Sequence, residues 1–245
     1  MVHYTLNSDM GEALGLHSFG NDVRLMELID IANVACGYHA GDPNVMEETI
    51  ALARQHRVKV GAHPGLPDIV GFGRRSMALH SRDARTIITY QVGALVAFLE
   101  AENMQLNHIK PHGALYGMLS RDEELMREAA GVAKNYDVPF LGLSGTAHEK
   151  VCRDMGVEFV GELYVDLDYS DQGILLIKAH PEEKSPEEVA QRTIQALETG
   201  TILSENGKEI AVDFRSICVH SDGPRSVEIA HAVREVLDRK GHAHV

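Results

Sequence analysis

Short strand-forming runs alternate with longer amphipathic segments along almost the whole sequence, and this alternation limits the possible folds more than any other feature. Successive strand-like runs are roughly 25–40 residues apart, which is the spacing of repeated strand–helix units around a parallel sheet. Helical periodicity occupies the intervals, for example at residues 23–31, 44–55 and 84–102. We therefore predict an α/β protein whose seven strands lie at residues 4–7, 32–36, 58–62, 106–110, 140–143, 159–165 and 216–220.

Local signals locate two helix starts and one hairpin. Asp42-Pro43 and Ser185-Pro186 each place a capping side chain before a proline that suits the first helical turn. Asn206-Gly207 lies between two alternating runs, so residues 201–214 are predicted to form a hairpin. Because no linker or low-complexity tract divides the sequence, we expect one β/α-barrel domain over residues 1–245 with the hairpin appended to it.

Side chains with reactive or anion-binding groups stand where the predicted strands end. The carboxyl ends of parallel strands meet on one face of a closed barrel, where barrel enzymes carry their active sites. In an open doubly wound sheet the same ends border a crevice. Either arrangement gathers these groups into one site. They are, in chain order, Asn7, Asp9, Glu12, Cys36, His39, Asp42, His63, Asp68, Arg74, Arg75, His108, Lys110, His112, Glu162, Asp166, Asp168, His220 and Asp222.

Composition excludes several classes of partner. The 245 residues carry a net charge of −13, whereas a protein that binds nucleic acid needs a surplus of Lys and Arg to contact phosphates. No run approaches the roughly 18 apolar residues of a membrane helix, and residues 1–6 are typical of a strand rather than of a secretion signal. Three scattered cysteines indicate a reducing compartment, so we predict a cytoplasmic protein. A basic pocket for one small anion is compatible with this charge.

Lys110 is the strongest single candidate for chemistry. It follows a strand-like run and lies between His108 and His112. A lysine in such a place either loses its proton and acts as a base or nucleophile, or stays charged and holds an oxyanion. The alternative is a surface lysine beside a turn at Pro111, but two flanking histidines at a strand end favour the functional interpretation.

Asp9, Glu12, His39 and His63 form a second group of candidates. The two carboxylates suit acid/base work or the binding of a cation, although Glu12 also fits the start of a helix. The two histidines follow glycine-bearing strand ends and are compatible with metal ligands, proton carriers or structural side chains. Their spacing matches no compact zinc signature, so a divalent metal stays open, with Asp9, His39 and His63 as candidate ligands.

The segment from Gly71 through Phe72 and Gly73 to Arg74 and Arg75 is predicted to bind an anion. Flexible backbone N–H groups and two guanidinium groups suit a carboxylate or a phosphate, and the alternative is a charged surface loop. The sequence contains no P-loop, and no Gly-x-Gly-x-x-Gly turn follows the first strand, so a dinucleotide cofactor is not expected. The remaining candidate is interpreted as a small buried hydrophobe rather than a nucleophile: Cys36.

Five motifs make the sequence resemble the LamB/YcsF family over nearly its whole length. In the order of that family they are NSDMGE at 7–12, ANVACGYHAGD at 32–42, GAHP through GFGRR at 61–75, HIKPHGALY at 108–116 and CVHSD at 218–222. The resemblance implies a seven-stranded, distorted TIM-like β/α barrel related to polysaccharide deacetylases. It also implies the A component of an ATP-hydrolysing 5-oxoprolinase, which opens the lactam of 5-oxoproline to glutamate together with subunits B and C.

With this resemblance, the strand-end groups divide into two expected sets. Catalysis is assigned to Asp9, Glu12, His39, His63, Lys110 and His112. Binding of a small anionic lactam or of phosphate is assigned to Asn7, Asn33, Asp42, Arg74, Arg75, Asp166, His220 and Asp222. ATP is expected as cofactor, held here or shared with the partner subunits. Two other functions stay open, namely a metal-dependent deacetylase or amidohydrolase that works alone, and a non-catalytic subunit that carries a small carboxylate.

The sequence departs from the family pattern mainly in one segment. Leu167 stands where the family usually has arginine, and Lys178 replaces a second expected arginine. Residues 180–183 replace a Pro-Gly stretch, while Ser8 and Ser221 replace a cysteine and a glycine. Loss of a guanidinium group beside an anionic ligand changes charge complementarity, so these departures bear on which lactam or amide is the substrate.

Overall fold

Six parallel strands form the main sheet of the computed structural model, which describes residues 3–15, 17, 20–176 and 184–242. The strands follow the order β3-β2-β1-β10-β5-β4, and every neighbouring pair is parallel. The strand–helix alternation predicted this α/β arrangement. The bounds are β1 Thr5–Met10, β2 Ile31–Ala35, β3 Lys59–His63, β4 Phe140–Gly142, β5 Phe159–Tyr164 and β10 Ser216–Cys218.

The seventh predicted strand, at residues 106–110, is not a regular strand. Only Ile109 forms bridges there, one to Ala62 of β3 and one to Phe140 of β4. The N–H and the carbonyl of Ile109 each form a hydrogen bond of 3.0 Å on the β4 side. Pro111 lacks an N–H and cannot extend this pairing. A single residue therefore links the two edges of the curled sheet, while a complete seven-stranded barrel and the kinship with polysaccharide deacetylases stay predictions.

The inner face of the curled sheet is polar. Alternate residues of a strand point to the same face, and the register places Asp9 beside Asn33 and Asn7 beside Cys218 on that inner face. The residues between them on β1, such as Leu6, face the other way and belong to the hydrophobic core under the helices. The sheet therefore gathers chemically active side chains inside its curl.

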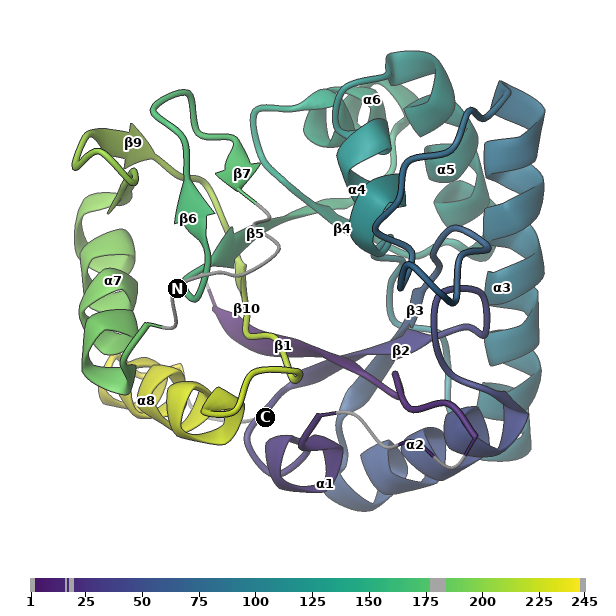
Figure 1. Cartoon of the computed structure of the whole chain (residues 1–245), viewed down its shortest axis with the longest axis horizontal. Helices are drawn as coiled ribbons and strands as arrows, with labels where there is room; N and C mark the ends of the chain where they lie inside the picture. Colours follow the sequence, from purple (N-terminus) through teal and green to yellow (C-terminus); the bar gives the residue numbers. More distant parts are fainter. Residues whose placement is uncertain (1–2, 16, 18–19, 177–183, 243–245) are drawn as a thin grey trace.

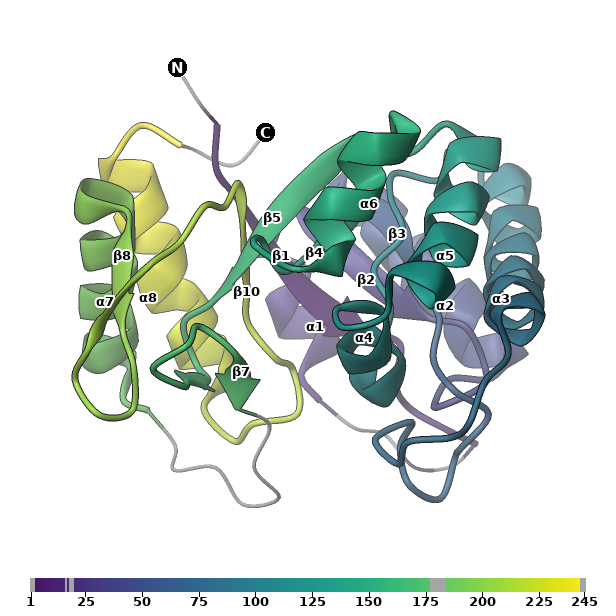
Figure 2. The ribbon, with the colours of Figure 1, turned by 90° about the horizontal axis from the view of Figure 1, so that it is seen from above.

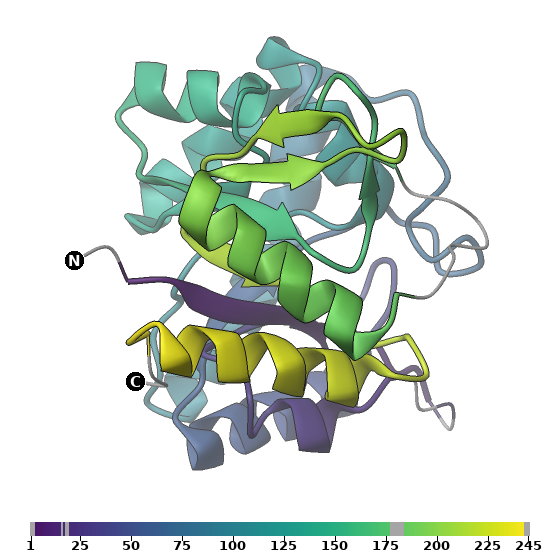
Figure 3. The ribbon, with the colours of Figure 1, turned by 90° about the vertical axis from the view of Figure 1, so that its left-hand side faces the viewer.

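The longer helices surround the outside of the sheet, as Figures 1 and 2 show. Seen from the side, α7 and α8 lie next to one another (Figure 3). The bounds are α1 Asp22–Leu25, α2 Pro43–His56, α3 Ser81–Ala101, α4 Gly113–Leu119, α5 Glu123–Tyr136, α6 Ala147–Met155, α7 Pro186–Thr199 and α8 Ser226–Arg239. None of the helices in the described ranges is both long and apolar enough to cross a membrane.

Both predicted helix starts are confirmed. The Asp42 carboxylate accepts hydrogen bonds from two backbone N–H groups at the start of α2, and the Ser185 hydroxyl accepts one at the start of α7. The predicted helices at 44–55 and 84–102 correspond to α2 and α3, whereas the one at 23–31 is reduced to the four residues of α1. Asp30 explains the early end, because its carboxylate accepts from the Leu6 N–H at 2.7 Å and draws the chain towards β1.

Two small antiparallel pairs stand apart from the main sheet. They are β6 Asp168–Tyr169 with β7 Leu175–Leu176, and β8 Thr201–Leu203 with β9 Glu209–Ala211. The second pair is the hairpin predicted at residues 201–214. Gly207 lies in its turn with a φ of +79°, a left-handed conformation that glycine adopts without a Cβ clash.

Candidate active site

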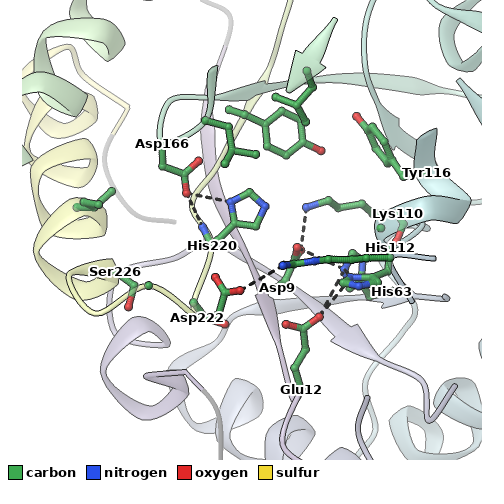
Figure 4. A pocket seen from close by; sticks show the side chains of 18 of the residues that line it. Asp9, Glu12, His63, Lys110, His112, Tyr116, Asp166, His220, Asp222 and Ser226 are labelled. Atoms are coloured by element: carbon green, nitrogen blue, oxygen red, sulfur yellow. Dashed lines mark hydrogen bonds and ion pairs between the residues drawn. The ribbon is translucent and has the colours of Figure 1, made fainter. Parts of the chain in front are cut away.

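A cavity of about 440 Å³ opens at the carboxyl ends of the strands. Side chains from β1, from β3 and from the loops after β5 and β10 face one another across it (Figure 4). This convergence is the one that the strand-end pattern predicted. The polar residues that line the cavity are Asp9, Glu12, His63, Arg74, Lys110, His112, Tyr116, Tyr164, Asp166, Lys184, His220, Ser221, Asp222, Arg225 and Ser226.

A buried ion pair lies at the floor of the cavity. The Lys110 Nζ atom contacts the Asp9 Oδ1 atom at 2.8 Å and the Cys218 Sγ atom at 3.1 Å, and the lysine side chain is only 2% exposed. The Glu162 Oε1 atom is 3.4 Å from the same ammonium nitrogen. Two carboxylates therefore share one lysine in a water-poor environment.

Charge determines the protonation of this pair. Burial by itself raises the pKa of Asp9, but the positive charges of His63 and Lys110 outweigh burial and hold that pKa well below its usual range. Burial by itself lowers the pKa of Lys110, but the Asp9 carboxylate outweighs it and the lysine pKa lies well above its usual range. The pair is thus an ammonium and a carboxylate near neutral pH.

Amide side chains hold Asp9 in place from below. The Asn33 Nδ2 atom donates to Asp9 Oδ1 at 2.8 Å and to Asn7 Oδ1 at 2.9 Å. His108 contacts the Asn33 Oδ1 atom at 2.7 Å through its Nε2 atom, which acts as the donor. Asn7 and Asn33 are fully buried and do not line the cavity. They orient the Asp9 carboxylate instead of binding substrate, which differs from their predicted role.

Three histidines and Glu12 form a tight cluster beside the ion pair. His63 Nε2 is 3.0 Å from His112 Nδ1, and His39 Nε2 is 3.0 Å from Glu12 Oε1. Burial lowers the pKa values of His39 and His112 well below the ordinary histidine range. Burial and then the Asp9 charge raise the pKa of Glu12 to about 7.

The Gly-Phe-Gly-Arg-Arg segment has a different arrangement from the predicted anion clamp. The Phe72 carbonyl accepts a hydrogen bond of 2.8 Å from His112 Nε2. Arg74 lines the cavity, where its Nη2 atom is 3.3 Å from Asp222 Oδ2. Arg75 does not line it, because its guanidinium binds both oxygens of Asp68. Of the two predicted guanidinium groups, only that of Arg74 is placed to contact a ligand.

His220 and Asp166 form an ion pair on the opposite side of the cavity (Figure 4). The His220 Nδ1 atom and its backbone N–H both lie 2.9 Å from Asp166 Oδ2. Burial by itself lowers the pKa of His220, but the Asp166 carboxylate outweighs it and raises that pKa to about 9. His220 is therefore a cation at neutral pH.

This ion pair predicts a loss of stability in mild alkali. Below pH 6.5 the folded and unfolded states both protonate His220, whereas between 6.5 and its folded pKa of about 9 only the folded state keeps the proton. The free energy of unfolding is expected to fall through this window by up to about 3 kcal/mol, reduced because the side chain is 24% exposed. Denaturant unfolding at pH 6.5 and 9.5 measures it, and His220→Gln should remove this part of the pH dependence.

Other predicted site residues lie away from the cavity. His39 is fully buried behind the cluster, and Asp42 caps α2 while also accepting from the Gly15 N–H at 2.9 Å. The Cys36 thiol donates to the Val34 carbonyl at 3.1 Å, and burial raises its pKa to about 12, which agrees with a structural cysteine. Lys178 and residues 180–183 are outside the described residues.

Several lining residues were not predicted from the sequence. Glu162 lies beside Lys110 and accepts a hydrogen bond of 3.0 Å from the Tyr164 hydroxyl. Lys184 lines the cavity and contacts Asp168 at 2.6 Å. The two-residue spacing of Glu162 and Tyr164 on β5 was the available signal, because it puts both on the polar inner face. Lys184 gave no comparable signal, since it follows no strand.

The LamB/YcsF family matches residues 4–245. The chain belongs to this family. The lactam utilization protein lamB of Emericella nidulans is 45% identical over 238 residues, which cover 95% of this chain and 93% of that protein. The A component of 5-oxoprolinase from Thermococcus onnurineus is 43% identical over 240 residues, with coverages of 96% and 94%.

A solved structure from the same family has the same fold. The crystal structure of the lactam utilization protein from Thermus thermophilus matches with a TM-score of 0.90 at 41% identity. The match covers 98% of this chain and 97% of that one. The fold and the order of the strand-end motifs thus agree with the family that the sequence resembles.

Proposed function

We propose that this chain is the A component of an ATP-dependent 5-oxoprolinase, which opens the five-membered lactam of 5-oxoproline to glutamate. The observation that carries the proposal is the buried Lys110–Asp9 ion pair at the floor of a cavity bordered by Arg74. Relatives with the name of this 5-oxoprolinase component support it across almost the whole chain. The cavity offers fixed cations and an ionised carboxylate to a small anionic amide.

The lactam needs activation because a five-membered cyclic amide is stable. Transfer of the γ-phosphoryl group of ATP to the lactam oxygen releases ADP and makes the ring carbon electrophilic. Water adds to that carbon, and the C–N bond breaks as the nitrogen takes up a proton. A second water hydrolyses the resulting acyl phosphate, which releases phosphate and glutamate.

Three cavity residues suit these steps. Lys110 stabilises the negative charge that develops around the lactam oxygen, because its ammonium is fixed and largely shielded from water. Arg74 binds the substrate carboxylate or phosphate through its guanidinium. Asp9 accepts the proton of the attacking water. All three border the same cavity.

The nucleotide and the partners belong to this proposal as well. The sequence has no P-loop, and the named relatives are parts of a larger enzyme. ATP therefore reacts at a site that subunits B and C complete. A cytoplasmic location and the absence of a nucleic-acid partner stay predictions from composition.

The proposal is tested by mixing the purified chain with candidate B and C subunits, ATP and 5-oxoproline. Glutamate and ADP are expected in equal amounts only when every component is present. Hydrolysis of an amide by the chain alone, dependent on a metal, would indicate the stand-alone amidohydrolase. Binding of 5-oxoproline without turnover in any mixture would indicate a non-catalytic carrier.

The two arginines of the Gly-Phe-Gly-Arg-Arg segment form a matched pair of variants. Arg74→Ala is expected to raise the KM for 5-oxoproline or for ATP roughly 10–100-fold, because a hydrogen bond to a charged ligand is lost. Arg75→Ala should leave both KM values near those of the parent, because Arg75 binds Asp68 outside the cavity. Steady-state kinetics decides, and equal effects of the two substitutions would contradict this assignment.

A further inference from the structure

The cluster of Glu12, His39, His63 and His112 has more hydrogen-bond acceptors than donors. One ligand atom from each residue lies within 4.8 Å of all the others. The closest approaches are 3.0 Å between His63 Nε2 and His112 Nδ1, 3.0 Å between His39 Nε2 and Glu12 Oε1, and 3.3 Å between His112 Nδ1 and Glu12 Oε1. All four side chains are buried, with exposures of at most 7%.

Backbone carbonyls locate the protons of two of these histidines. His63 Nδ1 is 2.7 Å from the Lys110 carbonyl, and His112 Nε2 is 2.8 Å from the Phe72 carbonyl. A carbonyl oxygen only accepts, so each of these nitrogens carries the proton. The opposite nitrogens, His63 Nε2 and His112 Nδ1, then present lone pairs to each other across 3.0 Å. Such an arrangement is repulsive unless a positive centre lies between them.

One shared proton does not satisfy this cluster. Asp9 Oδ2 lies 3.3 Å from His63 Nε2, and Glu12 Oε1 lies 4.0 Å from it, so carboxylate oxygens add to the surplus of acceptors. A proton bridges only one pair of atoms, whereas a metal ion accepts lone pairs from several ligands at once. A histidine that binds a metal also commonly donates its other N–H to a carbonyl, as His63 and His112 do here.

We propose that Glu12, His39, His63 and His112 bind one divalent transition-metal ion of the zinc type beside the cavity. Three imidazoles and one carboxylate suit Zn²⁺ and its neighbours, whereas Mg²⁺ and Ca²⁺ prefer all-oxygen sites. Ligand atoms about 2.0–2.1 Å from a tetrahedral ion stand about 3.3 Å from one another. Three of the separations above, at 3.0–3.3 Å, are close to that value.

Glycines allow the loops to close around the cluster. A Cβ atom on Gly73 would lie 2.7 Å from His39 Cβ and 2.9 Å from His112 Cδ2. A Cβ atom on Gly65 would lie 2.4 Å from His39 Nδ1. The loops after β3 therefore press on two of the ligands from opposite directions. This explains the Gly-Phe-Gly part of the segment, which the anion clamp did not.

A second group in the described part of the chain has suitable spacing but already contains a cation. Asp9, Cys218 and His220 also offer ligand atoms within 4.8 Å of one another. The Lys110 ammonium, however, contacts Asp9 Oδ1 at 2.8 Å and Cys218 Sγ at 3.1 Å. The lysine occupies the position that an ion would need, so the metal site consists of the histidine cluster and Asp9 serves the lysine.

The site is tested on the purified full-length chain without substrate, nucleotide or partner. After treatment with a chelator and addition of Zn²⁺, one zinc ion per chain is expected by plasma mass spectrometry. X-ray absorption should report imidazole nitrogens at about 2.0–2.1 Å. Because no turnover is measured, the result is independent of the 5-oxoprolinase proposal.

Three variants identify the ligands. His63→Ala and His112→Ala should each weaken zinc binding by more than the roughly 10–100-fold that loss of an outer hydrogen-bond partner costs. His220→Gln is the control and should bind as the parent does, because His220 belongs to the second group. Zinc binding that is absent, lost in the control, or surrounded only by oxygen would overturn the proposal. If the alanine variants do not fold, X-ray absorption of the parent still decides.

Discussion

Replacement of Lys110 by methionine is expected to lower kcat for 5-oxoproline by at least roughly 10²–10³-fold, the usual effect of removing one group that stabilises developing charge. Methionine keeps an unbranched apolar stem, but the ammonium that contacts Asp9 and Cys218 is lost. Steady-state turnover with ATP and the partner subunits measures the effect. Because Arg74 still lines the cavity, the KM should change much less than kcat.

The same substitution is expected to destabilise the fold, which the sequence alone did not indicate. A lysine at a strand end suggests a group that serves the site and contributes little to packing. In the structure Lys110 is only 2% exposed and is the countercharge of Asp9 and Glu162. Removal of one member of a buried ion pair commonly costs roughly 3–5 kcal/mol, because the other charge stays buried.

A double variant separates stability from chemistry. Lys110→Met combined with Asp9→Asn removes both charges of the pair and should recover much of the free energy of unfolding that the single variant loses. Turnover should remain absent in both. Denaturant unfolding and kinetics on the same preparations make the comparison, and parental turnover in a folded Lys110→Met protein would remove the lysine from the mechanism.

The sequence predicted the place of the site better than the pairing within it. Strand-end polarity identified Asp9, His63 and Lys110 because parallel strands bring their carboxyl ends together whatever the details of the sheet. The partners of each side chain depend on atoms that composition does not show. Arg75 illustrates this, because only the turn at Gly71 brings Asp68 to its guanidinium.

Backbone contacts account for most of what the sequence could not predict. The tautomers of His63 and His112 are set by the carbonyls of Lys110 and Phe72, and no residue pattern encodes a carbonyl direction. The same holds for the bridge at Ile109, which has the apolar character of a strand residue but belongs to a segment that pairs at one position. Residue type thus predicted the chemistry available, and tertiary hydrogen bonds decided how it is distributed.

Leu167→Arg is expected to lower the KM for 5-oxoproline roughly 10–100-fold, through a new hydrogen bond to a charged ligand worth about 1.5–3 kcal/mol. Leu167 lines the cavity, so a guanidinium there faces the ligand. Its backbone is fixed independently, because Arg192 Nη2 donates to the Leu167 carbonyl at 2.7 Å. The change therefore adds charge to the wall without moving the chain.

Two further variants show whether the charge or the shape at position 167 matters. Leu167→Met is the matched control and should leave the KM unchanged. Lys184 is the cation that competes for this space, since it also lines the cavity, although its ammonium contacts Asp168 at 2.6 Å. Lys184→Ala should therefore raise the KM of the parent less than Leu167→Arg lowers it. A higher KM in Leu167→Arg would mean that an existing cation already fills the position of the family arginine, and that the departure at Leu167 has been compensated rather than left as a loss.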